Sequence, residues 1–295
     1  MSTVTATPSE MPEFGFRTTE SEVSETRERL TGFIRDRVEA AGADGVVVCL
    51  SGGIDSSVTA ALATAALDRE RVYGLVLPAR KADDTGQFDA HLVADELGIG
   101  ARTVHLAPLL DAFEDTVAPS VSAESDRVAR GNALARLRAV TAYYAANTRN
   151  LLVCGTTNRT EWLLGYFTKF GDGAADIRPL ADCYKTEVRA LAADLGVPRT
   201  VREKPPSAGL WRDQTDAEEL GAPYSLIDCI LTKLVDEDLG IEGTAAELGV
   251  SVERVERYAR MHLEAEHKRE LAPTPKNDRE RTDLFHELES RFREE

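Results

Sequence analysis

Two patterns of apolar positions alternate along the first half of the chain. Short continuous apolar runs, of which Val46-Val47-Val48 is the clearest, are typical of strands buried on both faces. Segments with apolar residues every three or four positions are typical of amphipathic helices. The apolar runs predict strands at 46–50, 72–77, 102–106 and 150–154. The amphipathic segments predict helices at 21–41, 57–67, 84–97, 108–117 and 131–148. This order predicts an α/β fold, with a Rossmann-like parallel sheet that carries helices on both faces.

The pattern becomes helical beyond about residue 185. Helices are predicted at 185–195, 223–237, 243–249 and 251–264, so we expect a helical C-terminal region beside the sheet. Between the first two of them, several prolines and Gly209 predict a long loop over 198–222 that could close over a ligand. We expect a flexible N-terminal lead-in, one domain and a charged C-terminal tail, with the bounds 1–18, 19–272 and 273–295.

The first predicted strand runs into the sequence CLSGGIDSS, residues 49–57, and a helix is expected to follow. Two glycines let the backbone approach an anion closely, and free N–H groups at a helix start attract phosphate. The serine hydroxyls add hydrogen-bond donors, and Asp55 can hold a cation on the phosphates. The loop is not a Walker A loop, because no Gly-Lys-Ser/Thr follows. The alternative is an ordinary Gly-Ser turn, which the strand before it and the helix after it disfavour.

The charge balance is strongly acidic. The chain has 35 basic and 51 acidic residues, a formal net charge of −16, and only seven of the basic residues are lysines. Such a surface repels nucleic acid, so we expect no nucleic-acid partner. An acidic, lysine-poor composition is typical of proteins from salt-loving organisms, because concentrated salt screens the charge. The alternative is a moderately acidic protein from an organism that lives in ordinary salt.

The remaining composition indicates a cytoplasmic protein. No apolar run approaches the ~18 residues of a membrane span, so no membrane association is expected. The first residues, MSTVTATPSEMPEFGF, lack the basic-then-apolar order of a signal peptide. The four cysteines lie far apart and form no CxxC pair, which argues against a zinc site or a disulfide framework.

A second group of motifs follows the last predicted strand. The chain reads GTTNRTE at 155–161, GYFTKFGDGAAD at 165–176, PLADCYKTEVR at 179–189 and KPPSAGL at 204–210. Together with SGGIDSS and with GNALARLR at 131–138, these motifs resemble NAD synthetase over roughly residues 20–270. The SGGxDS pattern alone indicates only the wider superfamily of ATP pyrophosphatases, and YFTKFGDGAAD is much more specific.

The resemblance implies a reaction in two steps. The nicotinate carboxylate of deamido-NAD attacks the α-phosphorus of ATP, pyrophosphate leaves and an acyl-adenylate forms. Ammonia then attacks the acyl carbon, AMP leaves and NAD is formed. The resemblance also implies Mg²⁺ as the cofactor and a homodimer that binds deamido-NAD across its two-fold interface. Free ammonia is the expected nitrogen donor, because the chain has no room for the additional glutaminase domain of glutamine-using relatives.

The matching positions carry roles that the resemblance implies. ATP would be contacted by Ser51, Gly52, Gly53, Asp55, Ser56, Ser57, Arg80, Thr156, Lys185 and Ser207. Deamido-NAD would be contacted by Arg136, Lys169, Asp176, His267 and Lys268. Mg²⁺ would be held by Asp55 and Glu161, and the catalytic residues would be Asp172, Lys185 and Ser207. Asp172 is the candidate that holds ammonium and accepts its proton, for which a carboxylate needs a dry site.

Four of these residues also have a plainer interpretation. A glutamate such as Glu161, or a helix-start lysine such as Lys185, is usually solvated, and Asp172 lies in a Gly-rich turn of a common kind. His267 would otherwise be an exposed helix histidine. The sequence departs from the family after Leu77-Pro78, where relatives often have tyrosine or histidine followed by glycine.

Two other functions remain open at this stage. One is a different ATP pyrophosphatase that adenylates another carboxylate or a tRNA base, although the acidic charge opposes tRNA. The other is a non-catalytic nucleotide-binding protein on the same fold, since a fold does not prove an activity. Hydrolysis of ATP only in the presence of deamido-NAD would distinguish these possibilities.

Overall fold

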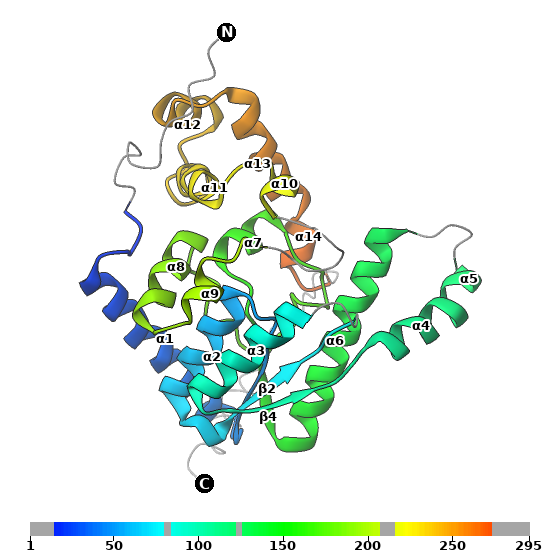
Figure 1. Cartoon of the computed structure of the whole chain (residues 1–295). Helices are drawn as coiled ribbons and strands as arrows, with labels where there is room; N and C mark the ends of the chain where they lie inside the picture. Colours follow the sequence, from blue (N-terminus) through cyan, green and yellow to red (C-terminus); the bar gives the residue numbers. More distant parts are fainter. Residues whose placement is uncertain (1–14, 80–83, 122–125, 207–215, 273–295) are drawn as a thin grey trace, which may run out of the picture.

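The computed structural model describes residues 15–79, 84–121, 126–206 and 216–272 (Figure 1). Within these residues, four parallel strands form one sheet in the order β3-β2-β1-β4. The strands are β1 (Gly45–Cys49), β2 (Val72–Val76), β3 (Gly100–Thr103) and β4 (Leu151–Cys154). The predicted α/β fold is confirmed, and the loops after β1, β2 and β4 meet at the carboxyl edge of the sheet.

Both faces of the sheet are buried. Val46 and Val48 face a core that contains residues of α1 (Glu20–Ala40), α2 (Ile54–Leu67) and α8 (Lys185–Asp194). Val47, between them, faces a second core with residues of α4 (Ala107–Thr116) and α6 (Arg127–Arg149). Side chains alternate across a strand, so a continuous valine run supplies apolar groups to both layers of helices.

The remaining elements complete these layers and the connections between them. Before α8 in the chain they are the 3₁₀ helix η1 (Arg69–Arg71), α3 (Asp84–Leu97), α5 (Ala118–Val121) and α7 (Arg159–Leu164). After α8 come α9 (Arg199–Arg202), α10 (Asp216–Leu220), α11 (Tyr224–Leu231), the π-helix η2 (Thr232–Asp236), α12 (Ile241–Leu248), α13 (Val252–Glu264) and α14 (Glu266–Arg269).

A third apolar core holds the helical C-terminal region to the rest of the molecule. Leu163 and Leu164 of α7 pack there with buried residues of α11, α12 and α13, such as Ile227 and Tyr258. In Figure 1 these helices lie together beyond the carboxyl ends of the strands, over α7 and α8. The predicted C-terminal helical region is present, and it faces the edge of the sheet where ligands bind.

Several elements differ from the sequence-based prediction. α6 begins at Arg127 rather than near 131, and β3 begins at Gly100 rather than at 102. α7 was not predicted, and the segment 198–222 contains the short helices α9 and α10. All four differences concern the ends of elements or helices of a few residues, where an apolar period has too few positions to be read.

The predicted lead-in over 1–18 is described only from residue 15. There, the Arg17 guanidinium contacts the Glu187 carboxylate of α8 (Nε to Oε1, 2.8 Å). The Phe16 ring packs edge-on against Tyr184, with the ring centres 5.6 Å apart. Residues 1–14 and the predicted tail at 273–295 lie outside the described residues. Among the described helices, none is both long enough and apolar enough to cross a lipid bilayer.

Candidate active site

A cavity of about 820 Å³ opens at the carboxyl edge of the sheet. Its walls come from the loops after β1, β2 and β4, from α6 and α14, and from the segment that follows α9. The sequence-predicted residues that line it are Ser51, Gly52, Gly53, Asp55, Ser56, Thr156, Glu161, Asp172, Lys185 and Lys268. The fold therefore gathers ten candidates, from segments far apart in the sequence, around one space.

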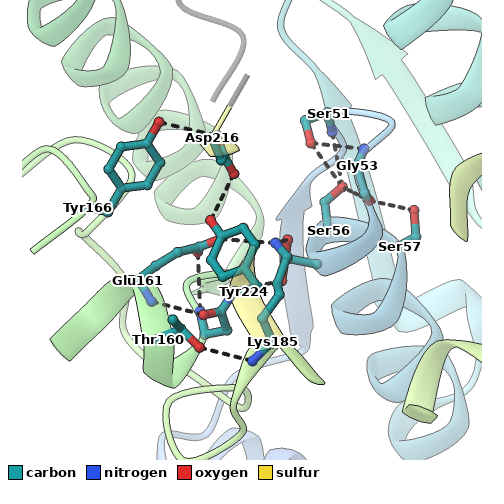
Figure 2. A network of polar contacts seen from close by, with 12 residues as sticks. Ser51, Gly53, Ser56, Ser57, Thr160, Glu161, Tyr166, Lys185, Asp216 and Tyr224 are labelled. Carbon is teal, nitrogen blue, oxygen red and sulfur yellow. Dashed lines mark hydrogen bonds and ion pairs between the residues drawn. The ribbon is translucent and has the colours of Figure 1, made fainter. Parts of the chain in front are cut away.

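The loop after β1 is held in shape by its own serines, as Figure 2 shows. The Ser51 hydroxyl accepts a hydrogen bond from the Gly53 N–H (3.2 Å), and the Ser56 hydroxyl donates to the Gly53 carbonyl (3.0 Å). Gly52 has a φ of +74°, and a Cβ there would collide with the Gly86 carbonyl, so only glycine fits. The loop leads directly into α2, whose first N–H groups have no partner within the helix.

Ser57 lies differently from the other loop residues. Its hydroxyl donates to the Gly53 carbonyl (2.8 Å), and its side chain is buried away from the large cavity. In this structure Ser57 stabilises the turn through the Gly53 carbonyl and does not line the cavity.

Lys185, at the start of α8, joins two carboxylates from different elements. Its ammonium Nζ lies 2.5 Å from Asp55 Oδ2 and 3.1 Å from Glu161 Oε1. Asn158, which is fully buried, donates from Nδ2 to the other oxygen of Asp55 (2.8 Å). α2, α7 and α8 therefore bring one cation and two anions to a single point beside the loop.

The charges of this cluster depend on one another. Burial disfavours the charged form of Lys185, but the carboxylates of Asp55 and Glu161 outweigh burial and raise its pKa. Burial raises the pKa of Glu161 to about 8, with a contribution from the charge of Asp55, although Lys185 opposes the change. Lys185 balances the charge of only one carboxylate, so a second cation at this point would favour the ionised form of Glu161.

Tyr224 lies beside the lysine, and hydrogen bonds connect it through Asp216 to Tyr166 (Figure 2). The Lys185 Nζ lies 5.0 Å from the centre of the Tyr224 ring, and the Tyr224 hydroxyl donates to Asp216 Oδ2 (2.8 Å). The Tyr166 hydroxyl donates to the other oxygen of Asp216 (3.2 Å). Burial and nearby carboxylates raise the pKa of Tyr224, so it stays a hydrogen-bond donor. Tyr224 and Asp216 belong to none of the recognised sequence motifs, and Tyr166 lies in the motif at 165–176 without a role predicted for it.

A buried aspartate holds the two helices that carry Glu161 and Lys185. Asp228 of α11 is fully buried and accepts hydrogen bonds from the Thr160 hydroxyl (2.6 Å), the Thr186 N–H (2.8 Å) and the Thr186 hydroxyl (2.6 Å). The Thr160 hydroxyl in turn accepts from the Lys185 N–H (3.0 Å). Burial raises the pKa of Asp228 to about 6 although these donors favour its ionised form. Asp228 therefore fixes Thr160, which precedes Glu161, and Thr186, which follows Lys185.

Asp172 lines another part of the same cavity. Its Oδ1 accepts a hydrogen bond from the Thr168 N–H (2.8 Å). The side chain is exposed within the cavity, and desolvation by the protein atoms around it raises the pKa of its carboxyl group. Lys268 lies on the same side, where its ammonium donates to the carbonyls of Gly165 (2.8 Å) and Phe167 (3.2 Å).

Four other candidates do not line the cavity. Asp176 accepts a hydrogen bond from the Val153 N–H (Oδ2, 2.7 Å). Arg136 donates to the Lys169 carbonyl (3.2 Å), and the Lys169 ammonium donates to the His267 carbonyl. Arg136, Lys169 and His267 therefore form a chain of contacts from α6 to α14 outside the cavity. Arg80 and Ser207 lie outside the described residues.

Comparisons with known proteins agree with this geometry. The family model described as NAD synthase matches residues 26–272. A protein of Pyrococcus horikoshii named NH(3)-dependent NAD(+) synthetase is 43% identical over 248 residues, which are 84% of this chain and 93% of the relative. A protein of the same name from Halobacterium salinarum is 42% identical over 268 residues, 91% of this chain and 99% of the relative.

A solved structure gives the same result at the level of the fold. The structure of NMN synthetase from Francisella tularensis superposes with a TM-score of 0.75 at 38% sequence identity. The superposition covers 86% of this chain and 99% of the other. Because the family model spans most of the chain and the relatives match over nearly their whole length, the chain belongs to the NAD synthase family.

Proposed function

We propose that this protein converts deamido-NAD to NAD, with ATP as the activating substrate and ammonia as the nitrogen donor. A carboxylate is a poor acylating group, because oxide would have to leave. Adenylation replaces that leaving group with AMP. The observation that carries the proposal is the position of Lys185, at 2% exposure, between Asp55 and Glu161 and beside the glycine loop.

The first step transfers the adenylyl group. A carboxylate oxygen of deamido-NAD attacks the α-phosphorus, the bond from that phosphorus to the bridging oxygen breaks, and pyrophosphate leaves. The N–H groups and hydroxyls of the 51–56 loop, which lines the cavity, would donate hydrogen bonds to phosphate oxygens. Lys185 supplies positive charge in a site shielded from water, where charge stabilisation contributes most to catalysis.

We also propose that Asp55 and Glu161 hold Mg²⁺ when ATP is bound. Both carboxylates already converge on one cation, and with both of them ionised the single charge of Lys185 balances only one. Among the described residues no three metal-binding side chains converge, so the remaining ligands would be phosphate oxygens and water, as magnesium prefers. The ion would neutralise charge on the phosphate oxygens during transfer.

The second step forms the amide. Ammonia attacks the acyl carbon, AMP leaves, and a proton must be removed from the attacking nitrogen. Asp172 is the proposed acceptor, because its raised pKa makes it a stronger base than an ordinary aspartate. Lys268 lines the same cavity, and it would contact deamido-NAD.

We further propose that the protein is a homodimer that completes the deamido-NAD site across its interface. Leu109, Phe113 and Val117 follow one another at four-residue spacing along and just after α4, and all three are exposed. Val140 and Tyr144 of α6 are 65% and 73% exposed at the same spacing. Residues four apart share a helix face, so both helices present apolar surface of the kind that mediates association.

The proposed setting is the cytoplasm of a cell with concentrated internal salt. A net charge of −16 destabilises a compact chain through self-repulsion, and salt screens that repulsion. The melting temperature should therefore rise when KCl is increased from about 0.1 M to about 1 M. A melting temperature that stays constant or falls over this range would contradict the proposal.

The adenylation step can be tested alone. With Mg²⁺ and labelled pyrophosphate but no ammonia, the protein should exchange label into ATP only when deamido-NAD is added. Exchange without added deamido-NAD would show that the adenylyl group goes to another acceptor, such as a group of the protein itself. No exchange with deamido-NAD under any salt condition would favour either a different carboxylate substrate or a nucleotide-binding protein without catalytic activity.

A second substrate is favoured by one observation. The Francisella tularensis neighbour is named NMN synthetase, so nicotinate mononucleotide, which would be amidated to NMN by the same chemistry, is the alternative acceptor. Measuring kcat/KM for both acceptors with one protein preparation decides between them. We expect the larger value with deamido-NAD, and a larger value with nicotinate mononucleotide would assign the shorter substrate.

A further inference from the structure

Lys204 lies on the wall of the cavity, in the segment that follows α9. Its ammonium Nζ is 2.8 Å from Asp89 Oδ2, and its side chain is 35% exposed, against 8% for Asp89. Pro206, two residues after Lys204, is bonded to the start of α10, because its carbonyl accepts a hydrogen bond from the Asp216 N–H (3.0 Å). Lys204 therefore has a defined position beside the cavity and keeps some access to it.

Asp89 places this lysine next to the glycine loop. The first turns of α3 pack against the loop, and Gly86 lies directly against Gly52. A Cβ at Gly52 would lie 3.0 Å from Cβ of Asp89. Because the ammonium of Lys204 is bonded to that carboxylate, it lies within a side chain's length of the point where the loop would hold phosphate.

The glycine loop has no cationic side chain of its own to balance the charge of a bound phosphate group. Residues 51–57 contain no lysine or arginine. The cationic side chains that line the described part of the cavity are Arg138, Lys185, Lys204 and Lys268. Lys185 contacts two carboxylates, Lys268 lies near Asp172, and Arg138 donates to the Leu77 carbonyl (3.2 Å).

We propose that Lys204 is a phosphate-binding residue, which leaves Asp89 and contacts the β- and γ-phosphates of ATP and the departing pyrophosphate. The inference rests on the proposed adenylation reaction and extends it to a residue outside the family roles given above. A partly exposed ion pair contributes little stability, so its exchange for a phosphate group with more charge is favourable. Lysine suits this task as a compact point charge with three donors.

Direct binding tests this proposal without any turnover. Dissociation constants for ATP, pyrophosphate and AMP are measured by calorimetry on the full chain with Mg²⁺, for the native protein and for Lys204→Met. We expect ATP and pyrophosphate to bind roughly tenfold more weakly in the variant, which is typical of losing a charged contact. AMP, which lacks the β- and γ-phosphates, should bind within about twofold of the native value.

Two controls separate this role from a structural one. Lys233→Met removes a lysine that pairs with Glu237 and Glu247 away from the cavity, and it should leave all three constants unchanged. Lys204→Arg keeps the charge and should retain most of the pyrophosphate affinity. Equal weakening of AMP and pyrophosphate by Lys204→Met, or unchanged pyrophosphate binding, would overturn the proposal.

Asp89→Asn provides an independent test should Lys204→Met fold poorly. Removing the competing carboxylate should tighten pyrophosphate binding in the native background. The same change should also tighten pyrophosphate binding in the Lys204→Arg background, because that variant keeps the positive charge for which Asp89 competes. An Asp89→Asn change that leaves pyrophosphate binding unaltered in both backgrounds would contradict the exchange. Because these constants need no deamido-NAD, the phosphate contact can stand even if the proposed amidation fails.

Discussion

At the scale of single residues, the ammonium of Lys185 lies between two carboxylates that come from different helices. The sequence identified this lysine through a family resemblance, since a helix-start lysine taken alone is usually solvated. It could not identify Asn158 and Tyr224, which fix the geometry around Asp55 and the lysine. These two contacts depend on how α7 and α11 pack, and no local pattern encodes that packing.

Replacing Lys185 with methionine should abolish most of the adenylation activity. The variant removes the positive charge beside the phosphate loop and leaves Asp55 and Glu161 facing each other. We expect deamido-NAD-dependent pyrophosphate exchange to fall roughly 10²-fold or more, as is typical when one charge-stabilising group is lost. A decrease of less than about threefold would show that the lysine is only a structural partner of the carboxylates.

Asp172→Asn should separate the two steps of the reaction. Asparagine can still accept the hydrogen bond from Thr168 N–H, but it cannot accept a proton from ammonium. We expect amide formation to fall roughly 10²-fold while pyrophosphate exchange remains near the native rate. Equal loss of both activities would contradict the assignment of Asp172 to the amide step.

The raised pKa of Asp172 predicts a pH dependence for this variant. The carboxylate is protonated at a higher pH than an ordinary aspartate, so the ratio of native to variant amidation rates should fall as the pH is lowered through that raised value.

The same raised pKa affects the stability of the fold. Between the unfolded and folded pKa values of Asp172 the unfolded state binds fewer protons, so the stability that this group contributes falls as the pH rises. At neutral pH, Asp172→Asn should therefore be at least as stable as the native protein in urea unfolding.

At the scale of elements, Asp228 joins α11 to the starts of α7 and α8, where Glu161 and Lys185 lie. The sequence predicted α8 and α11 but missed α7, a helix of six residues. Asn158 and Glu161 form a capping box at its start, and the Asn-x-x-Glu spacing was the signal that could have revealed it.

Asp228→Ala should destabilise the fold and disturb the site together. Three donors, one buried and two partly buried, would lose their acceptor, so we expect the free energy of unfolding to fall by about 3 kcal/mol. Urea unfolding measures this change, and the kcat for NAD formation should also fall. Asp194→Ala, which breaks a partly exposed pair with Arg27, is the matched control and should change stability by less than about 1 kcal/mol. Equal effects of the two variants would contradict the anchoring role of Asp228.

At the scale of the whole molecule, alternating apolar runs were enough to predict the parallel sheet and the helical region beyond it. Val46 to Val48 are fully buried, as a run covered on both faces requires. The arrangement of Arg136, Lys169 and His267 could not be predicted in this way, because it depends on where α14 meets α6. These residues lie outside the cavity of the single chain, which is the reason to expect a second copy at this face.

The dimer can be tested by placing charge on the apolar face of α6. Val140→Asp combined with Tyr144→Asp puts two carboxylates where the interface would be dry, and we expect sedimentation to show a monomer. Val252→Asp, at an exposed valine of α13, should leave a dimer intact. A native protein that sediments as a monomer at micromolar concentration would contradict the proposal directly.

The most direct test of the central claim is NAD formation by the purified protein. Deamido-NAD, ATP and Mg²⁺ are supplied in concentrated KCl, with ammonium or glutamine in separate reactions, and NAD, AMP and pyrophosphate are quantified together. We expect NAD with ammonium alone, with AMP and pyrophosphate formed in equal amounts. No NAD with either donor, at low and at high salt, would contradict the assigned function.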